Sequence, residues 1–188
     1  MKKQRLPIIL SALVPVFATL SCVAPSNLKV AALAPDHVLA SQVFDQVNNY
    51  RKSKGSGPLL GHPALNRMAE QHSEYMRENR GKFNLDGKNI SHMGSEGRAL
   101  AAMRMYHFTS TSENVAATPK ASSVPQSAAN LVTLWVHSPD HEAAMKNPEY
   151  THTGVGIVTD SDGTIFATQL FGTLTNSPMN DRMRYNGF

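Results

Sequence analysis

Cysteine and net charge are both scarce in this 188-residue chain. Its single cysteine, Cys22, excludes an internal disulfide, so packing alone must stabilise the fold. The formal net charge is +4, and it falls to 4 − 3 = +1 when Lys2, Lys3 and Arg5 of the N-terminal segment are set aside. We therefore expect no nucleic-acid partner.

Sequence signatures of common enzymes and metal proteins are also missing. The chain has no G-x-S-x-G nucleophile elbow and no recognisable pair of glycosidase carboxylates. "DSDG", residues 160–163, lacks the spacing and final glutamate of a calcium-binding EF-hand and indicates a turn. The nine methionines are dispersed, which favours filling of the core over copper binding. Nothing in these patterns indicates a particular catalytic chemistry.

The first 22 residues have the layout of a secretory signal. Positive charge comes first, an apolar run follows from Leu6 to Leu20, and small residues end it. Two prolines interrupt the run, which is short for a stable membrane span. The ending "ATLSC" resembles a bacterial lipobox, which implies acylation of Cys22. The alternative is an ordinary signal cleaved nearby, which leaves Cys22 as a free thiol.

Composition divides the rest of the chain into three parts. Residues 23–37 are rich in alanine, proline and small polar residues, and they predict a tether. Residues 38–172 carry enough apolar residues for one folded domain, and residues 173–188 form a polar C-terminal tail.

The first two thirds of the expected domain have helical patterns. Apolar residues recur at helical spacing from Val38 to Tyr50, and a second helix is expected to begin at Pro63 and end by Gly81. Residues 82–96 are loop-like, "GRALAAMRM" predicts a short helix, and "SVPQSAANLVTLWV" predicts a third main helix. Between these last two, "STSENVAATP" fits either a short strand or a loop that lines a cavity.

The C-terminal part of the domain predicts a β-hairpin. Two β-rich runs in residues 151–172 flank "DSDG". Gly154 and Gly156 occupy the same face of the first run, where their missing side chains would let a helix or strand approach closely. Helices first and a hairpin last indicate an α+β domain with helices packed on a small sheet.

Two histidines four residues apart, His137 and His141, would share a helix face and could share a zinc ion if the helix were unbroken. Pro139 lies between them and disfavours helical geometry at Ser138. We expect one helix to end near His137, and Ser138 and Pro139 to begin a new one. The two histidines are therefore not predicted to form a pair.

The segment "WVHSPDHEAAMKNPEYTHTGVGIV", residues 135–158, resembles the bacterial branch of the CAP superfamily. That superfamily is named for cysteine-rich secretory proteins, antigen 5 and plant pathogenesis-related class 1 proteins. The resemblance continues in "AEQHSEYM", "ISHMGSEG", "SENVAA" and "FATQLFG", and so covers essentially the whole domain. It implies a three-layer α-β-α sandwich with a small, mainly antiparallel sheet and a central cleft.

The resemblance also implies residues for the cleft. His92 and His141 match the family's two histidines, and Glu113 matches its first glutamate. The second glutamate normally stands three residues after the tryptophan, where this chain has Ser138. Three ligands and water could make an open site for zinc or another divalent cation. With one carboxylate missing, we expect weak metal binding or none, and a polar cleft is the alternative.

Other polar residues receive weaker roles. Ser138 and Gln169 are further candidates for contact with a ligand, and Ser91 and Ser112 neighbour cleft residues. His72 is expected to be buried and structural, with a place behind the cleft as the alternative. His137 is a candidate for the rim of the cleft. The histidines without motif support are expected on the surface or in loops: His62, His107 and His152.

Together these observations predict an exported, lipid-anchored protein of the bacterial cell envelope. It would bind a ligand or a partner through the cleft of His92, Glu113 and His141. A lipid, another apolar envelope molecule or an envelope protein would be the partner, and acylated Cys22 would hold the domain at the membrane. The main alternative is a hydrolase that uses the same cleft with a metal ion or a histidine base. A structural envelope protein without a small ligand is the third possibility.

Overall fold

The computed structural model describes residues 34–80 and 92–174. The chain divides into two units, Met1–Ala31 and Ala32–Phe188, and every described residue belongs to the second. The expected signal (1–22) and Cys22 therefore lie outside the described residues, as does Ser91. None of the described helices is both long enough and apolar enough to span a lipid bilayer.

A four-stranded sheet in the order β1-β3-β4-β2 is the centre of the domain. The strands are β1 (Leu60–Gly61), β2 (Phe108–Pro119), β3 (His152–Thr159) and β4 (Thr164–Leu174). Only the short β1 pairs in parallel, with β3, and the other pairings are antiparallel. The predicted hairpin is confirmed as β3 and β4. The stretch "STSENVAATP" belongs to a strand of 12 residues, longer than the short strand expected.

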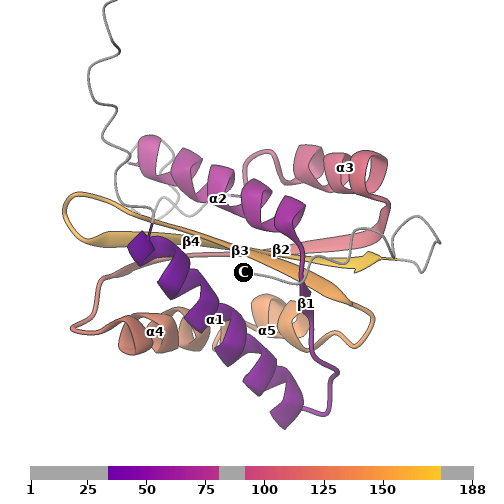
Figure 1. The fold of residues 1–188 in the computed structure, drawn as a ribbon, viewed down its shortest axis with the longest axis horizontal. Coiled ribbons are helices and arrows are strands. Elements are labelled where there is room, and N and C mark those ends of the chain that lie inside the picture. Colours follow the sequence, from indigo (N-terminus) through magenta and orange to yellow (C-terminus); the bar gives the residue numbers. More distant parts are fainter. Residues whose placement is uncertain (1–33, 81–91, 175–188) are drawn as a thin grey trace, which may run out of the picture. The chain divides into compact units, whose positions relative to one another are not determined.

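Five helices cover the two faces of this sheet (Figure 1). They are α1 (Ala34–Ser53), α2 (Pro63–Glu78), α3 (Ser95–Tyr106), α4 (Val124–Val136) and α5 (Pro139–Lys146). Figure 1 shows α2 and α3 on one side of the strands, and α1, α4 and α5 on the other. The predicted α+β class and the α-β-α sandwich with a mainly antiparallel sheet are confirmed.

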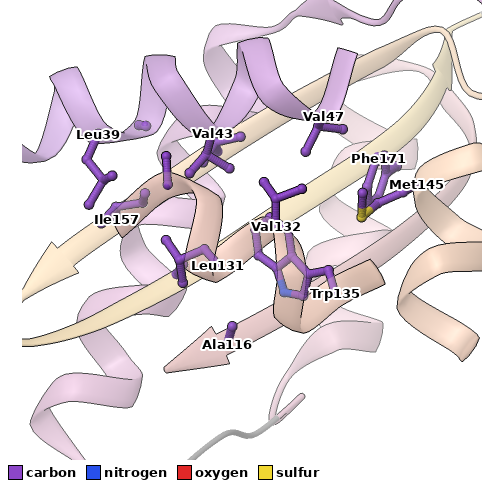
Figure 2. Close-up of a cluster of buried hydrophobic side chains, with 14 of the residues drawn as sticks. Leu39, Val43, Val47, Ala116, Leu131, Val132, Trp135, Met145, Ile157 and Phe171 are labelled. Carbon is purple, nitrogen blue, oxygen red and sulfur yellow. The ribbon is translucent and has the colours of Figure 1, made fainter. Parts of the chain in front are cut away.

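The larger hydrophobic core lies between the sheet and the α1, α4 and α5 layer. In Figure 2, Leu39, Val43 and Val47 of α1 point toward side chains of α4 and the sheet. Trp135 is fully buried there, and its indole Nε1–H donates a 3.1 Å hydrogen bond to the Val115 carbonyl on β2. This bond satisfies the one polar atom of the indole and fixes the end of α4 against the sheet.

Helix α2 packs directly on β3 because two glycines leave room for its backbone. A Cβ atom on Gly154 would lie 2.2 Å from the Asn66 backbone nitrogen, and one on Gly156 would lie 2.0 Å from that of Glu70. The Asn66 side chain completes the contact, because its Oδ1 accepts the Val155 N–H at 3.0 Å. The close approach expected from the glycine spacing is confirmed.

Helix boundaries follow the prolines. Helix α4 ends at Val136, His137 caps it, and α5 begins at Pro139 after Ser138, as predicted. Two expected boundaries differ from the structure. Helix α1 begins at Ala34, four residues before the expected Val38, and α3 begins at Ser95, inside the expected loop. Both helices begin in polar sequence that contains alanine or glycine, where hydrophobic periodicity does not indicate the first residue of a helix.

Candidate functional site

A cavity of about 290 Å³ lies between α3 and strands β2 and β4. Its lining combines apolar side chains with polar ones. The apolar ones are Leu65, Ala99, Ala102, Leu170 and Phe171. The polar ones are His92, Ser95, Glu96, Arg98, Thr111, Ser112 and Glu113. The cavity thus combines an apolar wall with a charged and hydroxyl-bearing side, the character of many small-molecule sites.

Glu113 is the most highly connected polar residue of the cavity, and its side chain is only 6% exposed. Arg98 donates two hydrogen bonds to its carboxylate, from Nε to Oε2 at 2.6 Å and from Nη2 to Oε1 at 2.8 Å. A third Arg98 bond, from Nη1 to the Met93 carbonyl at 2.9 Å, holds the guanidinium in place. The bidentate geometry is the strongest form of arginine–carboxylate pairing.

His92 adds a further contact to the same carboxylate. Its Nδ1 lies 2.9 Å from Glu113 Oε1, while its side chain is 50% exposed. An ionised carboxylate only accepts hydrogen bonds, so the proton of this contact is on Nδ1. In the neutral ring Nε2 is then unprotonated and can accept a hydrogen bond.

Burial by itself raises the pKa of the Glu113 carboxyl. The hydrogen bonds from His92 and Arg98 and the charge of Arg98 outweigh burial and hold this pKa below its ordinary value. Glu113 is therefore a fixed negative charge near neutral pH and a poor general base. On the inner side, His72 is buried, with its Nε2 3.9 Å from Glu113 Oε1. His72 is both buried, as expected, and behind the cleft, which was the alternative.

His141 approaches the site from the other face of the sheet, on α5. Its ring centroid is 6.2 Å from that of His92. Its backbone carbonyl accepts a 3.1 Å hydrogen bond from Asn114 Nδ2, and this bond ties the first turn of α5 to β2. Burial, and then the nearby His92, lower the pKa of the His141 ring. His141 is therefore neutral near pH 7, but it does not line the cavity described above.

Two other expected site residues lie apart from the cavity. Gln169 is fully buried, and its Nε2 donates to Thr153 Oγ1 at 3.1 Å. It shares the α1, α4 and α5 side of the sheet with its cross-strand neighbour Asn114. Ser138 is half-buried before α5, and its side chain makes no capping hydrogen bond. Neither lines the cavity.

The remaining histidines correct one expectation. His62, expected on the surface or in a loop, does lie in the connection between β1 and α2, but it is only 6% exposed and caps α2, because its Nδ1 accepts the Ala64 N–H at 3.3 Å. Its ring packs 5.0 Å from Phe108 and 5.9 Å from the half-buried His152. Sequence reasoning missed it, although a histidine just before a helix-starting proline occupies a capping position. His107 is exposed, as expected, and the exposed His137 bonds back to α4 through the Thr133 carbonyl.

Arg98 is the main cleft residue that sequence reasoning missed. A signal exists: Arg98 stands one helical turn before Ala102, which is buried, so it lies on the inward face of α3. A charged residue on an inward face requires a partner of opposite charge. The polar stretch "STSENVAATP" contains one acidic residue, Glu113.

The side chains do not fit a metal ion. Within residues 34–80 and 92–174, no three His, Asp, Glu or Cys side chains are arranged so that they could hold one. Arg98 engages both oxygens of Glu113, and the proton on His92 Nδ1 points at Glu113. A zinc site needs unprotonated nitrogens and free carboxylate oxygens around one point.

Comparisons with known proteins bear on the family and the fold. A family model described as "Cysteine-rich secretory protein family" matches residues 44–171. No curated protein matches the sequence.

Several solved bacterial structures share the fold. An outer surface protein of Borrelia burgdorferi is 19% identical with a TM-score of 0.53, over 76% of this chain and 96% of that one. An extracellular Bacillus anthracis protein that contains an SCP domain is 25% identical with a TM-score of 0.53, over 73% and 41%. A cysteine-rich secretory protein of Staphylococcus aureus is 20% identical with a TM-score of 0.50, over 73% and 38%. This chain therefore spans about two fifths of the last two.

Proposed function

Since the chain belongs to the cysteine-rich secretory protein (CAP) family, we propose that it is an exported envelope protein that binds an amphipathic molecule in the cleft beside α3. The ligand would place its apolar part against Leu65, Ala102 and Leu170. Its polar end would face His92, Arg98 and the hydroxyl groups of the cavity. The domain would act as a binding module and not as an enzyme.

The composition of the cavity supports this proposal most strongly. Its volume of about 290 Å³ is close to the lower end for small-molecule pockets. Glu113 is already engaged by Arg98 and His92, so it is not free to take a proton from a substrate. Within the described chain, neither Ser95 nor Ser112 hydrogen-bonds to a histidine, so no activated nucleophile faces the cavity.

The signal-like N-terminal sequence supports an envelope location, and so do the descriptions of two relatives. Those from B. burgdorferi and B. anthracis are described as an outer surface protein and an extracellular protein. Acylation of Cys22 would hold the domain at a membrane, and the alternative remains cleavage without a lipid. Metabolic labelling with an alkyne fatty acid separates the two, because Cys22→Ser abolishes the label only if Cys22 is acylated.

The binding proposal is tested by fluorescence titration with an environment-sensitive fatty acid, dansyl-undecanoic acid. Ala99 lines the cavity, so Ala99→Trp fills it. Leu100 is 42% exposed on the same helix and does not line the cavity, so Leu100→Trp adds the same side chain outside it. We expect saturable binding by the wild type and by Leu100→Trp, and at least tenfold weaker binding by Ala99→Trp. Equal binding by all three proteins, or none by any, rejects the proposal.

A histidine-based hydrolase is the second candidate, and one contact favours it. His92 Nδ1 is held by the Glu113 carboxylate at 2.9 Å, as a catalytic histidine is oriented by an acid, with Nε2 left to accept a proton. Hydrolysis of p-nitrophenyl butyrate by the wild type and His92→Ala tests it. Turnover above the buffer rate that His92→Ala abolishes would replace the binding module with an enzyme. Equal rates would leave the binding module as the function.

A further inference from the structure

Arg98 places a positive charge against the Glu113 carboxylate, where a metal ion would have to bind. Its guanidinium touches both oxygens of Glu113 and is itself fixed by the Met93 carbonyl. Its side chain is 16% exposed and that of Glu113 is 6% exposed, so water screens this pair weakly. An arginine in a protein does not lose its proton near neutral pH. The negative charge of the buried Glu113 carboxylate is therefore already balanced by Arg98.

A divalent cation at the same carboxylate would meet two obstacles. It would have to displace an Arg98 hydrogen bond or share Oε2 with Arg98, and in either position it would stand beside the guanidinium charge. His92 adds a third obstacle, because the nitrogen that faces Glu113 carries a proton. The residues that would form the metal site are present, but Arg98 engages both oxygens of Glu113, and the protonated nitrogen of His92 faces the same carboxylate.

We infer that Arg98 is the specificity-determining residue that excludes divalent metal ions from this cleft. This inference rests on the proposed function and adds that its cleft does not bind divalent metal ions. The guanidinium takes the place of the ion, so the cleft can receive an organic ligand without a metal. Removal of the guanidinium would free both Glu113 oxygens from Arg98 and remove its positive charge, so that Glu113 could bind zinc together with the nearby His92 and His141.

Zinc titration calorimetry on four forms of the protein tests this inference. Arg98→Met removes the charge and keeps a side chain of similar length. Arg104→Met makes the same change at an exposed position of α3, so it controls for effects of the substitution itself. Arg98→Met/His92→Ala reports whether a gained site uses the cleft. Cobalt absorbance in the visible region gives a second readout of coordination by nitrogen and carboxylate ligands.

We expect the wild type and Arg104→Met to give the same weak zinc isotherm. Arg98→Met should gain one site with a Kd at least tenfold lower, and the double variant should lose it. A folded Arg98→Met protein that gains no site would overturn the inference. So would a wild-type isotherm as tight as that of Arg98→Met.

A measurement that does not use Arg98→Met covers the case in which that variant does not fold. Proton NMR of the His92 and His141 rings, assigned through His92→Asn and His141→Asn, should show no change when zinc is added. Broadening or shifting of both rings at micromolar zinc would overturn the inference. Neither experiment contains an organic ligand, so their outcome is separate from that of the dansyl-undecanoic acid titration.

Discussion

Glu113 and Asn114 are consecutive on β2, and each holds one of the two cleft histidines from an opposite face of the sheet. The Glu113 carboxylate contacts the His92 ring, whereas the Asn114 amide donates to the His141 backbone carbonyl. The alternation of side chains along a strand places both histidines at the same edge of the sheet, with their ring centroids 6.2 Å apart. Two neighbouring residues of one strand thus position His92 and His141 from opposite faces of the sheet.

The first prediction concerns Asn114. Its side chain is fully buried and makes the bond that ties α5 to β2. Asn114→Ala should lower the free energy of unfolding by about 1–3 kcal/mol, because the half-buried His141 carbonyl loses its donor. Ser138→Ala, at the start of the same helix, removes no capping bond and should cost less than about 0.5 kcal/mol. Urea denaturation measures both values, and a larger loss for Ser138→Ala contradicts this role of Asn114.

Glu113 itself shows what the sequence could and could not predict. Its assignment to the cleft came from a family resemblance, as did the assignments of His92 and His141. Arg98 has no counterpart in the motifs that carry that resemblance, and its contact with Glu113 spans fifteen residues and a change from helix to strand. Local patterns do not encode such a pairing.

Local chemistry did predict the features that depend on backbone geometry. Pro139 restricts the residue before it, so the break between α4 and α5 could be placed to the residue. Gly154 and Gly156 share one face of a strand, which predicted the close approach of a helix or strand. Gln169 was expected near the cleft, but adjacent strand residues face opposite sides, and its neighbour Leu170 faces the cavity. Which face a residue takes depends on the register of the whole sheet.

The second prediction is acid sensitivity caused by His62. Burial, and then the nearby His152, lower the pKa of His62 to about 4. The unfolded chain has the ordinary pKa of about 6.5, so between these values it binds more protons than the folded protein does. The contribution of His62 to stability is complete above pH 6.5 or so and is lost as the pH falls toward about 4. At that lower limit the loss amounts to about 3 kcal/mol.

The variant His62→Asn isolates this effect. Asparagine keeps an oxygen that can cap α2, but it does not titrate. Unfolding free energies at pH 7 and pH 4 should differ by about 3 kcal/mol more in the wild type than in His62→Asn. The other titrating groups, Glu113 and His141 included, are present in both proteins and contribute equally to the pH dependence of the unfolding free energy. The same pH dependence in the wild type and His62→Asn would therefore contradict the role of His62.

The third prediction concerns the contact between α2 and β3. A Cβ atom on Gly156 would lie 2.0 Å from the Glu70 nitrogen, in helix backbone that cannot move independently. Gly156→Ala should therefore destabilise the domain by at least about 3 kcal/mol. Gly57 has no atom within 4 Å of its Cβ position, so Gly57→Ala should change the stability by less than about 1 kcal/mol. Thermal unfolding compares the two variants, and similar melting temperatures refute the close packing.

The fourth prediction concerns Arg51, a fully buried arginine whose hydrogen bonds go to backbone carbonyls. It joins the end of α1 to the carbonyls of Met145 and Asn147 at the end of α5, at 2.6 Å and 2.9 Å. Arg51→Met should cost about 3 kcal/mol or more, because several buried carbonyls lose their donor together. Lys52→Met, at the exposed neighbouring position, should cost less than about 0.5 kcal/mol. Comparable losses in a urea titration contradict a structural role for Arg51.

The most direct test of the account is the titration of dansyl-undecanoic acid into the wild type and Ala99→Trp, with and without EDTA. We expect the same Kd for the wild type in both buffers and at least tenfold weaker binding by Ala99→Trp in both, because the ligand occupies the cavity beside Arg98 and needs no metal ion. Loss of wild-type binding in EDTA, or undiminished binding by Ala99→Trp, would contradict it.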